Sequence, residues 1–374
     1  MCRALRALFV LPSLDGGGAE RVTLDLLRLL GRDRVRPCLF LFQHKGALLS
    51  EASPEHLVSN AVDRSGDKAF FSPLPRLIAS AQAVDVIVAC LQCRTTYLAW
   101  LAGIVTRRPV IGWVQNAAVP GSPMDSVRHR FLMRLVQPRL AASVFPCERA
   151  YEVLAKRIPF ARTRVEFIPN FINHERVRQL AGGDRAVELG HPGGDAMLTA
   201  VGRLAPQKGF DILLRAVHEL HARGNRCRLI ILGEGPERSK LMQLVTDLSL
   251  QGYVEMPGFT ANPYSIMRRS DVFVLASRFE GLPLALMEAR ALGIPIVSTD
   301  CVAGPREILD GGSYGLLVPV DDHIAMADAI GSVIDKRQCR LSQTVSLHED
   351  LADSGARTAV AAWEALLDDV AART

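Results

Sequence analysis

Short apolar runs that alternate with amphipathic stretches constrain the fold of this chain more than any other feature. Apolar runs typical of β-strands lie at 5–11, 36–42, 84–90, 109–114 and 142–145. Helical periodicity fills the intervals at 19–31, 94–106 and 123–137. This order is typical of βαβ units, in which a parallel sheet carries helices on both faces.

The same alternation begins again after residue 195. Strand candidates follow at 196–202, 227–233, 271–277, 294–299 and 315–320, and helical patterns at 208–222, 236–249, 283–292 and 321–335. The stretch 178–195 between the two series is rich in glycine and charge and lacks periodicity, which indicates a linker. The predicted fold class is therefore α/β, with two doubly wound, Rossmann-like domains that face a cleft. Ligands of such sheets bind at the carboxyl ends of the strands.

The length of 374 residues also favours two domains. We assign 1–180 to an N-terminal domain, 181–195 to the linker and 196–350 to a C-terminal domain. Residues 351–374 read as an amphipathic helix that can pack back on the N-terminal domain.

Charge and cysteine usage exclude some classes of function. The net charge of +5 suits anionic small molecules or an anionic membrane surface and is too small to indicate nucleic acid. The one CxxC pair, Cys90 and Cys93, has no second pair or histidine cluster, which favours plain buried thiols in a reducing cytoplasm. The first apolar run leads straight into a glycine turn, as a strand does and a signal peptide does not. No run of 18 apolar residues occurs. We expect a cytoplasmic protein that can also lie peripherally on the inner face of the membrane.

Three consecutive glycines, Gly16, Gly17 and Gly18, follow the first strand and open a helix. A dinucleotide fingerprint would need a further glycine where Arg21 stands, and the acid expected after the second strand is absent. NAD binding is therefore disfavoured. The glycines form either a simple tight turn or a place where a phosphate or sugar approaches the backbone, and we favour the second.

Two cations follow the strand at 196–202. Arg203 lies just past the strand end and Lys208 begins the next helix. Together they could neutralise a diphosphate. Ordinary surface cations are the alternative.

The stretch SRFEGLPLALMEA places Glu280 before a turn and Glu288 in the second turn of an apolar helix. Pro283 is suited to the first helical position. Backbone N–H groups at this helix start could bind a phosphate, and they belong to Gly281, Leu282 and Leu284. The two carboxylates could accept hydrogen bonds from sugar hydroxyls. A solvated helix residue is the alternative for Glu288, although its neighbours are apolar.

The ordered motifs VGRLAPQKGFD, LGEGPERSKL, FEGLPLALMEA, GIPIVSTD and GPREIL resemble the C-terminal half of the retaining nucleotide-sugar glycosyltransferases of family four, which have the GT-B fold. They cover roughly residues 196–320. The first half resembles the family more weakly, through the GGAER loop and PNFIN at 169–173. The ending STDC…GPREIL resembles the branch that builds bacterial surface polysaccharides, often from UDP-linked sugars.

The resemblance implies a role for each matching residue. Arg203 and Lys208 would hold the donor diphosphate and stabilise the leaving group, Glu280 would contact the donor sugar, and Glu288 the ribose. By the same resemblance, Gly16 to Gly18 would close the phosphate side of the donor site. The loop at Gly233 to Gly235 and the turn at Pro257 to Phe259 would border the base. No metal and no cofactor are implied. The implied partners are a nucleotide-sugar donor and a glycan or lipid-linked acceptor.

A histidine common in the family is replaced here by Gln115-Asn116, if that alignment holds. Gln115 could hydrogen-bond a sugar hydroxyl but could not act as a base. Outside the site, Met124 to Arg139 interleaves arginines with apolar residues. That pattern suits either a helix on an anionic membrane or an ordinary helix with a solvated basic face.

Three other functions stay open. A nucleotide-sugar epimerase could use the same fold, and a non-catalytic nucleotide-sugar-binding protein could share the site. A dehydrogenase is weakened by Arg21 and the missing acid.

Overall fold

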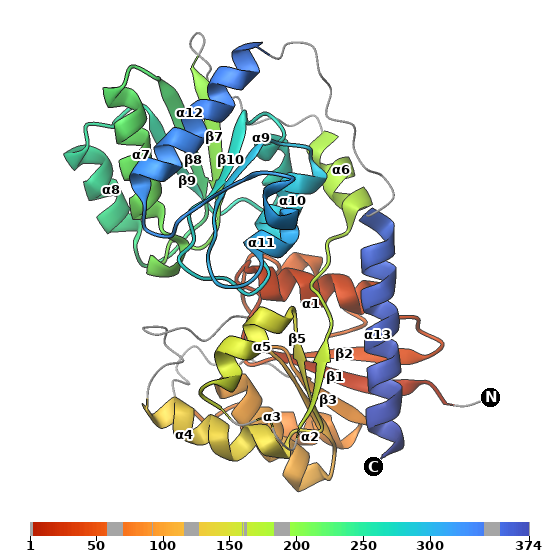
Figure 1. Cartoon of the computed structure of the whole chain (residues 1–374). Coiled ribbons are helices and arrows are strands. Elements are labelled where there is room, and N and C mark those ends of the chain that lie inside the picture. The colour runs from red at the N-terminus through yellow and green to blue at the C-terminus, as the bar shows by residue number, and fades with distance from the viewer. Residues whose placement is uncertain are drawn as a thin grey trace. The chain divides into compact units, whose positions relative to one another are not determined.

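The computed structural model describes residues 3–57, 70–91, 93–115, 127–158, 160, 163–182, 195–339 and 352–373. The chain forms two compact units. Unit 1 comprises Met1–Phe171 and Gly355–Thr374, and unit 2 comprises Ile172–Ser354. Each unit contains one parallel six-stranded sheet (Figure 1). The predicted α/β class with two doubly wound domains is confirmed.

The sheet of unit 1 has the strand order β2-β1-β3-β4-β5-β6. Its strands are β1 (Leu5–Leu11), β2 (Val35–Leu41), β3 (Val86–Ala89), β4 (Val110–Trp113), β5 (Ala142–Phe145) and β6 (Arg164–Phe167). The central strands are buried along almost their whole length, which explains their continuous apolar runs. The strand order reverses between β1 and β3, so the loops that follow these strands diverge there.

The helices of unit 1 lie between these strands in the chain. They are α1 (Gly18–Leu29), α2 (Leu74–Gln82), α3 (Arg94–Thr106), α4 (Val127–Val136) and α5 (Glu148–Ala155), with short 3₁₀ turns η1 (Leu49–Glu51) and η3 (Gln137–Arg139). The C-terminal helix α13 (Ala352–Ala372) runs beside this sheet (Figure 1). Its Trp363 ring packs against Trp113 and Phe9, with centroid distances of 4.6 and 6.4 Å. Its Glu364 accepts hydrogen bonds from Gly31 N and from the Arg34 guanidinium, each at 2.9 Å.

The sheet of unit 2 has the strand order β12-β11-β10-β7-β8-β9. Its strands are β7 (Ala196–Val201), β8 (Cys227–Leu232), β9 (Val254–Gly258), β10 (Val272–Leu275), β11 (Ile296–Thr299) and β12 (Leu316–Val318). Here the order reverses between β7 and β10, which are neighbours in the sheet. Its helical elements are α6 (His174–Gly182), η4 (Pro206–Lys208), α7 (Phe210–Ala222), α8 (Arg238–Asp247), α9 (Tyr264–Met267), α10 (Leu284–Ala291), α11 (Pro305–Ile308), η5 (Asp310–Gly312) and α12 (His323–Cys339).

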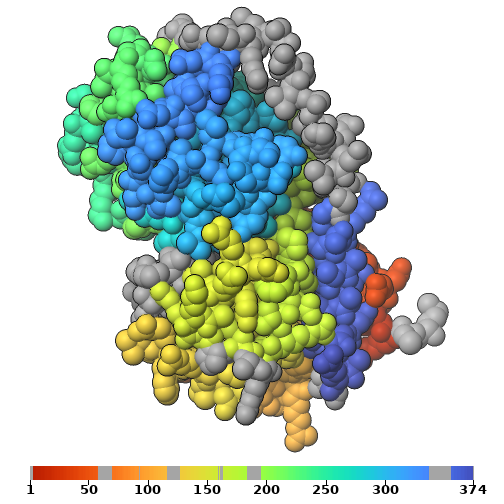
Figure 2. All heavy atoms as spheres, viewed as in Figure 1, coloured from red at the N-terminus to blue at the C-terminus, as the bar shows by residue number. Residues whose placement is uncertain are grey.

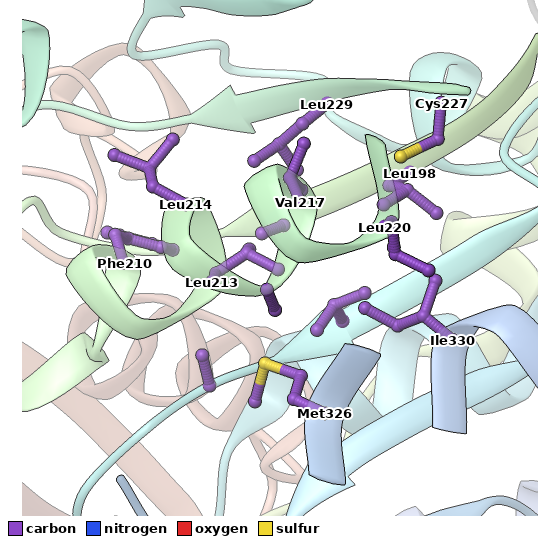
Figure 3. Close-up of a cluster of buried hydrophobic side chains, with 14 of the residues drawn as sticks. Leu198, Phe210, Leu213, Leu214, Val217, Leu220, Cys227, Leu229, Met326 and Ile330 are labelled. Atoms are coloured by element: carbon purple, nitrogen blue, oxygen red, sulfur yellow. The ribbon is translucent and has the colours of Figure 1, made fainter. Parts of the chain in front are cut away.

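The core of unit 2 fixes the helix that follows η4. Figure 3 shows α7 presenting Leu213, Val217 and Leu220 to the strands and to α12, where Met326 and Ile330 lie. All of these side chains are buried. Their three- and four-residue spacing along α7 is the apolar stripe of a core-facing helix. The start of α7, and η4 before it, are thereby anchored to the sheet.

The sequence interpretation differs from the structure in a few elements. Residues 178–182 were assigned to an aperiodic stretch but form the last part of α6, where Leu180 O accepts a hydrogen bond from Asn262 Nδ2 at 2.9 Å. This tertiary contact stabilises the end of α6, although the sequence there has no helical periodicity. The rest of the predicted linker, 183–194, lies outside the described residues. No helix among the described residues is long and apolar enough to cross a bilayer.

Candidate functional site

The loops after β7 and β10 meet where the strand order of unit 2 reverses. Ligands of doubly wound sheets bind outside the carboxyl ends of the strands at this point. The loop after β7 carries Arg203 and Lys208, and the loop after β10 carries Glu280. Lys208 Nζ donates a hydrogen bond to Glu280 Oε1 at 2.6 Å. The fold therefore joins residues that lie 72 positions apart in the chain.

Glu280 is a buried carboxylate, with only 4% of the residue exposed. Its Oε1 also accepts a hydrogen bond from Ser277 Oγ at 2.6 Å. A buried charge needs such partners, and here the ammonium of Lys208 supplies the opposite charge. The backbone of the loop is held as well, because Glu280 N donates to Val302 O at 3.5 Å in the loop after β11. Burial and then the charge of Glu280 raise the pKa of Cys301 to about 12, so this thiol stays neutral.

Two glycines near Lys208 allow close packing: Gly202 leaves room for the Lys208 side chain, and Gly209 leaves room for a neighbouring backbone. A Cβ at Gly202 would stand 3.2 Å from Lys208 Cε, so the lysine stem passes directly over that position. Gly209 has a φ of +61°, and a Cβ there would overlap the carbonyl oxygen of Ala276 at the end of β10. Only glycine fits this approach without strain. The sequence did not single out either residue.

Arg278 links the two loops, and the sequence analysis missed it. Its guanidinium donates two hydrogen bonds to the carboxylate of Asp211 at 2.9 and 2.7 Å, and a third to Asp321 at 2.7 Å. It also donates to Pro206 O at 2.7 Å, while its own backbone N–H donates to Gln207 O at 2.8 Å. Burial alone would raise the pKa of Asp211, but the hydrogen bonds and charge of Arg278 outweigh it and lower that pKa. We call Arg278, Asp211 and Asp321 the arginine clamp.

The start of α10 differs by one position from the prediction. The helix begins at Leu284, and Pro283 is the N-cap residue with φ −71° and ψ 110° rather than the first helical residue. A neighbouring helix start packs here, because a Cβ at Gly304 would lie 2.6 Å from Pro283 Cδ. At α11, Gly304 N donates to Glu307 Oε2 at 2.9 Å. Glu307 therefore caps the start of its own helix.

Glu288 is buried rather than solvated, with 4% of the residue exposed. Its Oε1 accepts a hydrogen bond from Tyr264 Oη of α9 at 2.8 Å. A hydroxyl is thus one partner of this carboxylate, and the partners of Glu280 include the Lys208 ammonium.

The other residues predicted for unit 2 lie at the carboxyl ends of neighbouring strands. Arg203 is exposed beyond β7. Gly235 follows β8, and a Cβ at this position would overlap the carbonyl oxygen of Leu204. Phe259 follows β9 and is half-buried. These loops are tied together, because Gly233 N donates to Gly258 O at 2.9 Å.

In unit 1, the glycine loop follows β1 at the carboxyl edge of the sheet. Gly17 and Gly18 are exposed, and Gly17 is the N-cap of α1. The carboxylate of Glu20 lies against Gly17, at the position that a Cβ would occupy. An acid in the first turn already stabilises this helix start.

Gln115 follows β4 at the same edge and is buried. Its Oε1 accepts a hydrogen bond from Asn170 Nδ2 at 3.1 Å. Its Nε2 is buried and has no hydrogen-bond partner in the part of the chain that the structure describes. A buried amide donor without a partner is rare, and an oxygen of a ligand would satisfy it. Asn116 lies outside the described residues.

Both cysteines of the predicted pair are free thiols, and Cys90 is buried whereas Cys93 is half-buried. Burial raises the pKa of Cys90 to about 12 and that of Cys93 to about 11. Across the described ranges, no three His, Cys, Asp or Glu side chains are grouped so that they could hold a metal ion.

Comparison with known proteins identifies the family. A family model described as Glycosyltransferase Family 4 matches residues 16–176, and one described as Glycosyl transferases group 1 matches residues 185–349. The first match spans the sheet of unit 1 except β1, and the second spans the sheet of unit 2. The chain belongs to the family 4 glycosyltransferases. The predicted family resemblance is therefore confirmed.

This glycosyltransferase is similar to one curated protein along most of its length and to another along less than half of it. It is 29% identical over 344 residues to the N-acetylgalactosamine-N,N'-diacetylbacillosaminyl-diphospho-undecaprenol 4-alpha-N-acetylgalactosaminyltransferase of Campylobacter jejuni, an alignment that covers 88% of this chain and 90% of that protein. It is 35% identical over 171 residues to the putative colanic acid biosynthesis glycosyltransferase WcaL of Salmonella typhimurium. That second match covers 41% of this chain and 42% of WcaL.

Solved structures confirm the GT-B fold of the glycosyltransferase. HepE of Anabaena, in complex with UDP and glucose, superposes with a TM-score of 0.72 at 19% identity, over 99% of this chain and 98% of that one. Sucrose-phosphate synthase of Thermosynechococcus elongatus gives a TM-score of 0.73 at 17% identity, over 98% and 97% of the two chains.

Proposed function

We propose that this enzyme transfers a hexose from a UDP-linked donor, with retention of configuration, to a glycan or lipid-linked acceptor in cell-surface polysaccharide or glycoconjugate synthesis. The observation that carries the proposal is the Lys208–Glu280 pair at the reversal point of the unit 2 sheet. The names of similar proteins support it. HepE was solved with UDP and glucose, and the Campylobacter relative is named for a diphospho-undecaprenol acceptor.

The cations act on the leaving group in this proposal. Arg203 and Lys208 bind the diphosphate and stabilise the negative charge that develops as the sugar–phosphate bond breaks. Because Lys208 is already paired with Glu280, one ammonium can contact both the diphosphate and the carboxylate that faces the sugar. Glu280 then accepts hydrogen bonds from donor-sugar hydroxyls.

The phosphates, ribose and base of the donor are bound by groups that take no part in the reaction. Backbone N–H groups between Gly281 and Leu284 at the start of α10 contact phosphate oxygens. Glu288 holds the ribose, and Gly235 and Phe259 border the base.

In unit 1, the Gly16–Gly18 loop and the amide of Gln115 contact sugar hydroxyls. An amide cannot take up a proton, so the acceptor hydroxyl gives its proton to the departing phosphate oxygen. Attack on the face from which the phosphate leaves retains the anomeric configuration.

A panel of nucleotide sugars, assayed for nucleotide release with and without EDTA, tests the function. We expect UDP release from one UDP-sugar, faster with a lipid-linked or glycan acceptor, and undiminished by EDTA. A change of the donor sugar without UDP release would show an epimerase, and UDP binding without turnover would show a binding protein. Activity that is lost with EDTA and restored by magnesium or manganese would contradict the metal-independent chemistry.

A further inference from the structure

The outer face of α4 carries an exposed apolar stripe that the proposed function does not use. Val127, Phe131 and Leu135 are 74%, 69% and 41% exposed, and they recur every four residues. Residues at this spacing share one face of a helix. Scattered single apolar residues on a surface are ordinary, but a continuous stripe marks an interaction site.

The opposite face of α4 is the one that packs in unit 1. His129, Met133 and Val136 are buried there. At 100° per residue, their mean direction lies roughly 160° from that of the exposed stripe. The His129 ring meets Tyr97 of α3, where Tyr97 Oη hydrogen-bonds His129 Nδ1 and the ring centroids lie 5.6 Å apart, and this side-chain contact shows which face turns inward. The helix is therefore apolar on two sides, and only one of them is covered by unit 1.

Basic residues border the exposed stripe. By the same geometry, Arg128 lies on one side of it, and Arg130 and Arg134 lie on the other. Arg139 follows in η3, and the segment 127–139 contains no aspartate or glutamate. An exposed apolar stripe between arginines is the pattern of a helix that lies in the interface of an anionic bilayer. The apolar side chains enter the boundary between headgroups and acyl chains, and the arginines contact the headgroup phosphates.

The last turn of α3 also carries exposed apolar side chains. Ile104 and Val105 are more than half exposed there, and Arg107 and Arg108 follow. Both helices connect the carboxyl end of one parallel strand to the start of the next, so they run in the same direction. Tyr97 and His129 join their first turns, so their last turns lie at the same end of unit 1. Figures 1 and 2 show α4 at the surface of the unit.

We propose that Val127, Phe131 and Leu135, with their flanking arginines, dock the enzyme on a bilayer that contains anionic lipid. Charge complementarity selects this occupant, since a stripe framed by arginines and free of acids matches an anionic headgroup layer. The proposal does not depend on the identity of the donor. It would give the enzyme access to a lipid-linked acceptor.

Vesicle flotation of the full chain tests the proposal. We expect the protein to float with phosphatidylcholine vesicles that contain phosphatidylglycerol, and not with pure phosphatidylcholine vesicles. Binding should weaken as salt rises, because ions screen the arginines. Phe131→Asp with Leu135→Asp should lower the vesicle affinity at least tenfold. Arg128→Gln with Arg134→Gln should lower it and reduce its salt dependence.

The matched control is Met242→Asp, since Met242 is a 52% exposed apolar residue on α8 of unit 2. It should bind vesicles like the wild type. Thermal melts and UDP binding should be unchanged in all variants, which separates this test from a failure of the proposed function. Absence of wild-type flotation, or equal loss in Met242→Asp, would overturn the proposal. So would a wild-type dimer that Phe131→Asp separates, because the stripe would then bind a second copy of the chain.

Discussion

Glu280 and Glu288 are both buried carboxylates, and the partners of Glu280 include a cation. Glu280 accepts from the Lys208 ammonium and the Ser277 hydroxyl, in loops that flank the reversal point of the sheet. Glu288 accepts from the Tyr264 hydroxyl. A carboxylate paired with a cation can respond to charge that develops during a reaction. In the proposed function Glu288 holds the ribose, a group that does not react.

Changing each glutamate to glutamine should therefore affect different kinetic constants. Glu280→Gln should lower kcat at saturating donor, since the interaction strengthens in the transition state. Glu288→Gln should chiefly weaken donor and UDP binding, by about 1–2 kcal/mol for the lost charged hydrogen bonds. Full donor-saturation curves and thermal melts measure both.

Tyr264→Phe is the control for the second substitution, because it removes the hydroxyl and leaves the carboxylate. If it weakens UDP binding as much as Glu288→Gln, the ribose role is wrong and the pair is structural. The same kinetic defect in both glutamine variants would also contradict the division of roles.

At the scale of elements, the arginine clamp joins η4, the first turn of α7 and the loop after β10. Lysine cannot replace the planar, two-pronged contact of arginine with a carboxylate. Arg278→Lys should leave the fold intact but let the loops that carry Lys208 and Glu280 separate. We expect kcat/KM to fall roughly tenfold, the effect of about 1.4 kcal/mol. Arg306→Lys is the control, since Arg306 pairs with Asp300 on the surface. An equal loss in both variants would refute a positioning role.

The pH dependence of stability offers a second measure of the clamp. The folded pKa of Asp211 is lowered, so its contribution is present above the unfolded pKa and is lost as the pH falls through the folded value. Asp211→Asn should therefore melt below the wild type at neutral pH, and the two melting temperatures should converge in acid below the ordinary aspartate range. A difference that persists at low pH would show that the clamp does not depend on this charge.

The elements also show what the sequence could predict. The central strands and α7 follow from continuous apolar runs and a regular apolar stripe. The edge strands β6 and β9 were missed because their residues are mostly half-buried, so no apolar run marks them. The clamp was missed because Arg278 and Asp211 stand 67 positions apart and meet only through loop conformation. Lys208 and Glu280 were predicted by motif, but their direct contact was not.

At the scale of the whole molecule, the chain forms unit 1 and then unit 2, and its last helix, α13, belongs to unit 1 again. α13 places Trp363 against Phe9 and Trp113, so the last helix completes the core of unit 1. An amphipathic pattern predicts such a helix but not the side chains that it contacts. One family model matches most of unit 1 and the other matches most of unit 2, in agreement with one doubly wound fold per unit.

The central claim is that the reversal point of the unit 2 sheet holds a nucleoside diphosphate, and calorimetric titration of UDP tests it most directly. The wild type should bind UDP, and Arg203→Ala and Lys208→Ala should each weaken binding by about 1.5–3 kcal/mol, the range for a charge-assisted hydrogen bond. Lys240→Ala, which removes an exposed lysine of α8 in the same unit, should bind like the wild type. Unchanged UDP affinity in both Arg203→Ala and Lys208→Ala would contradict the account.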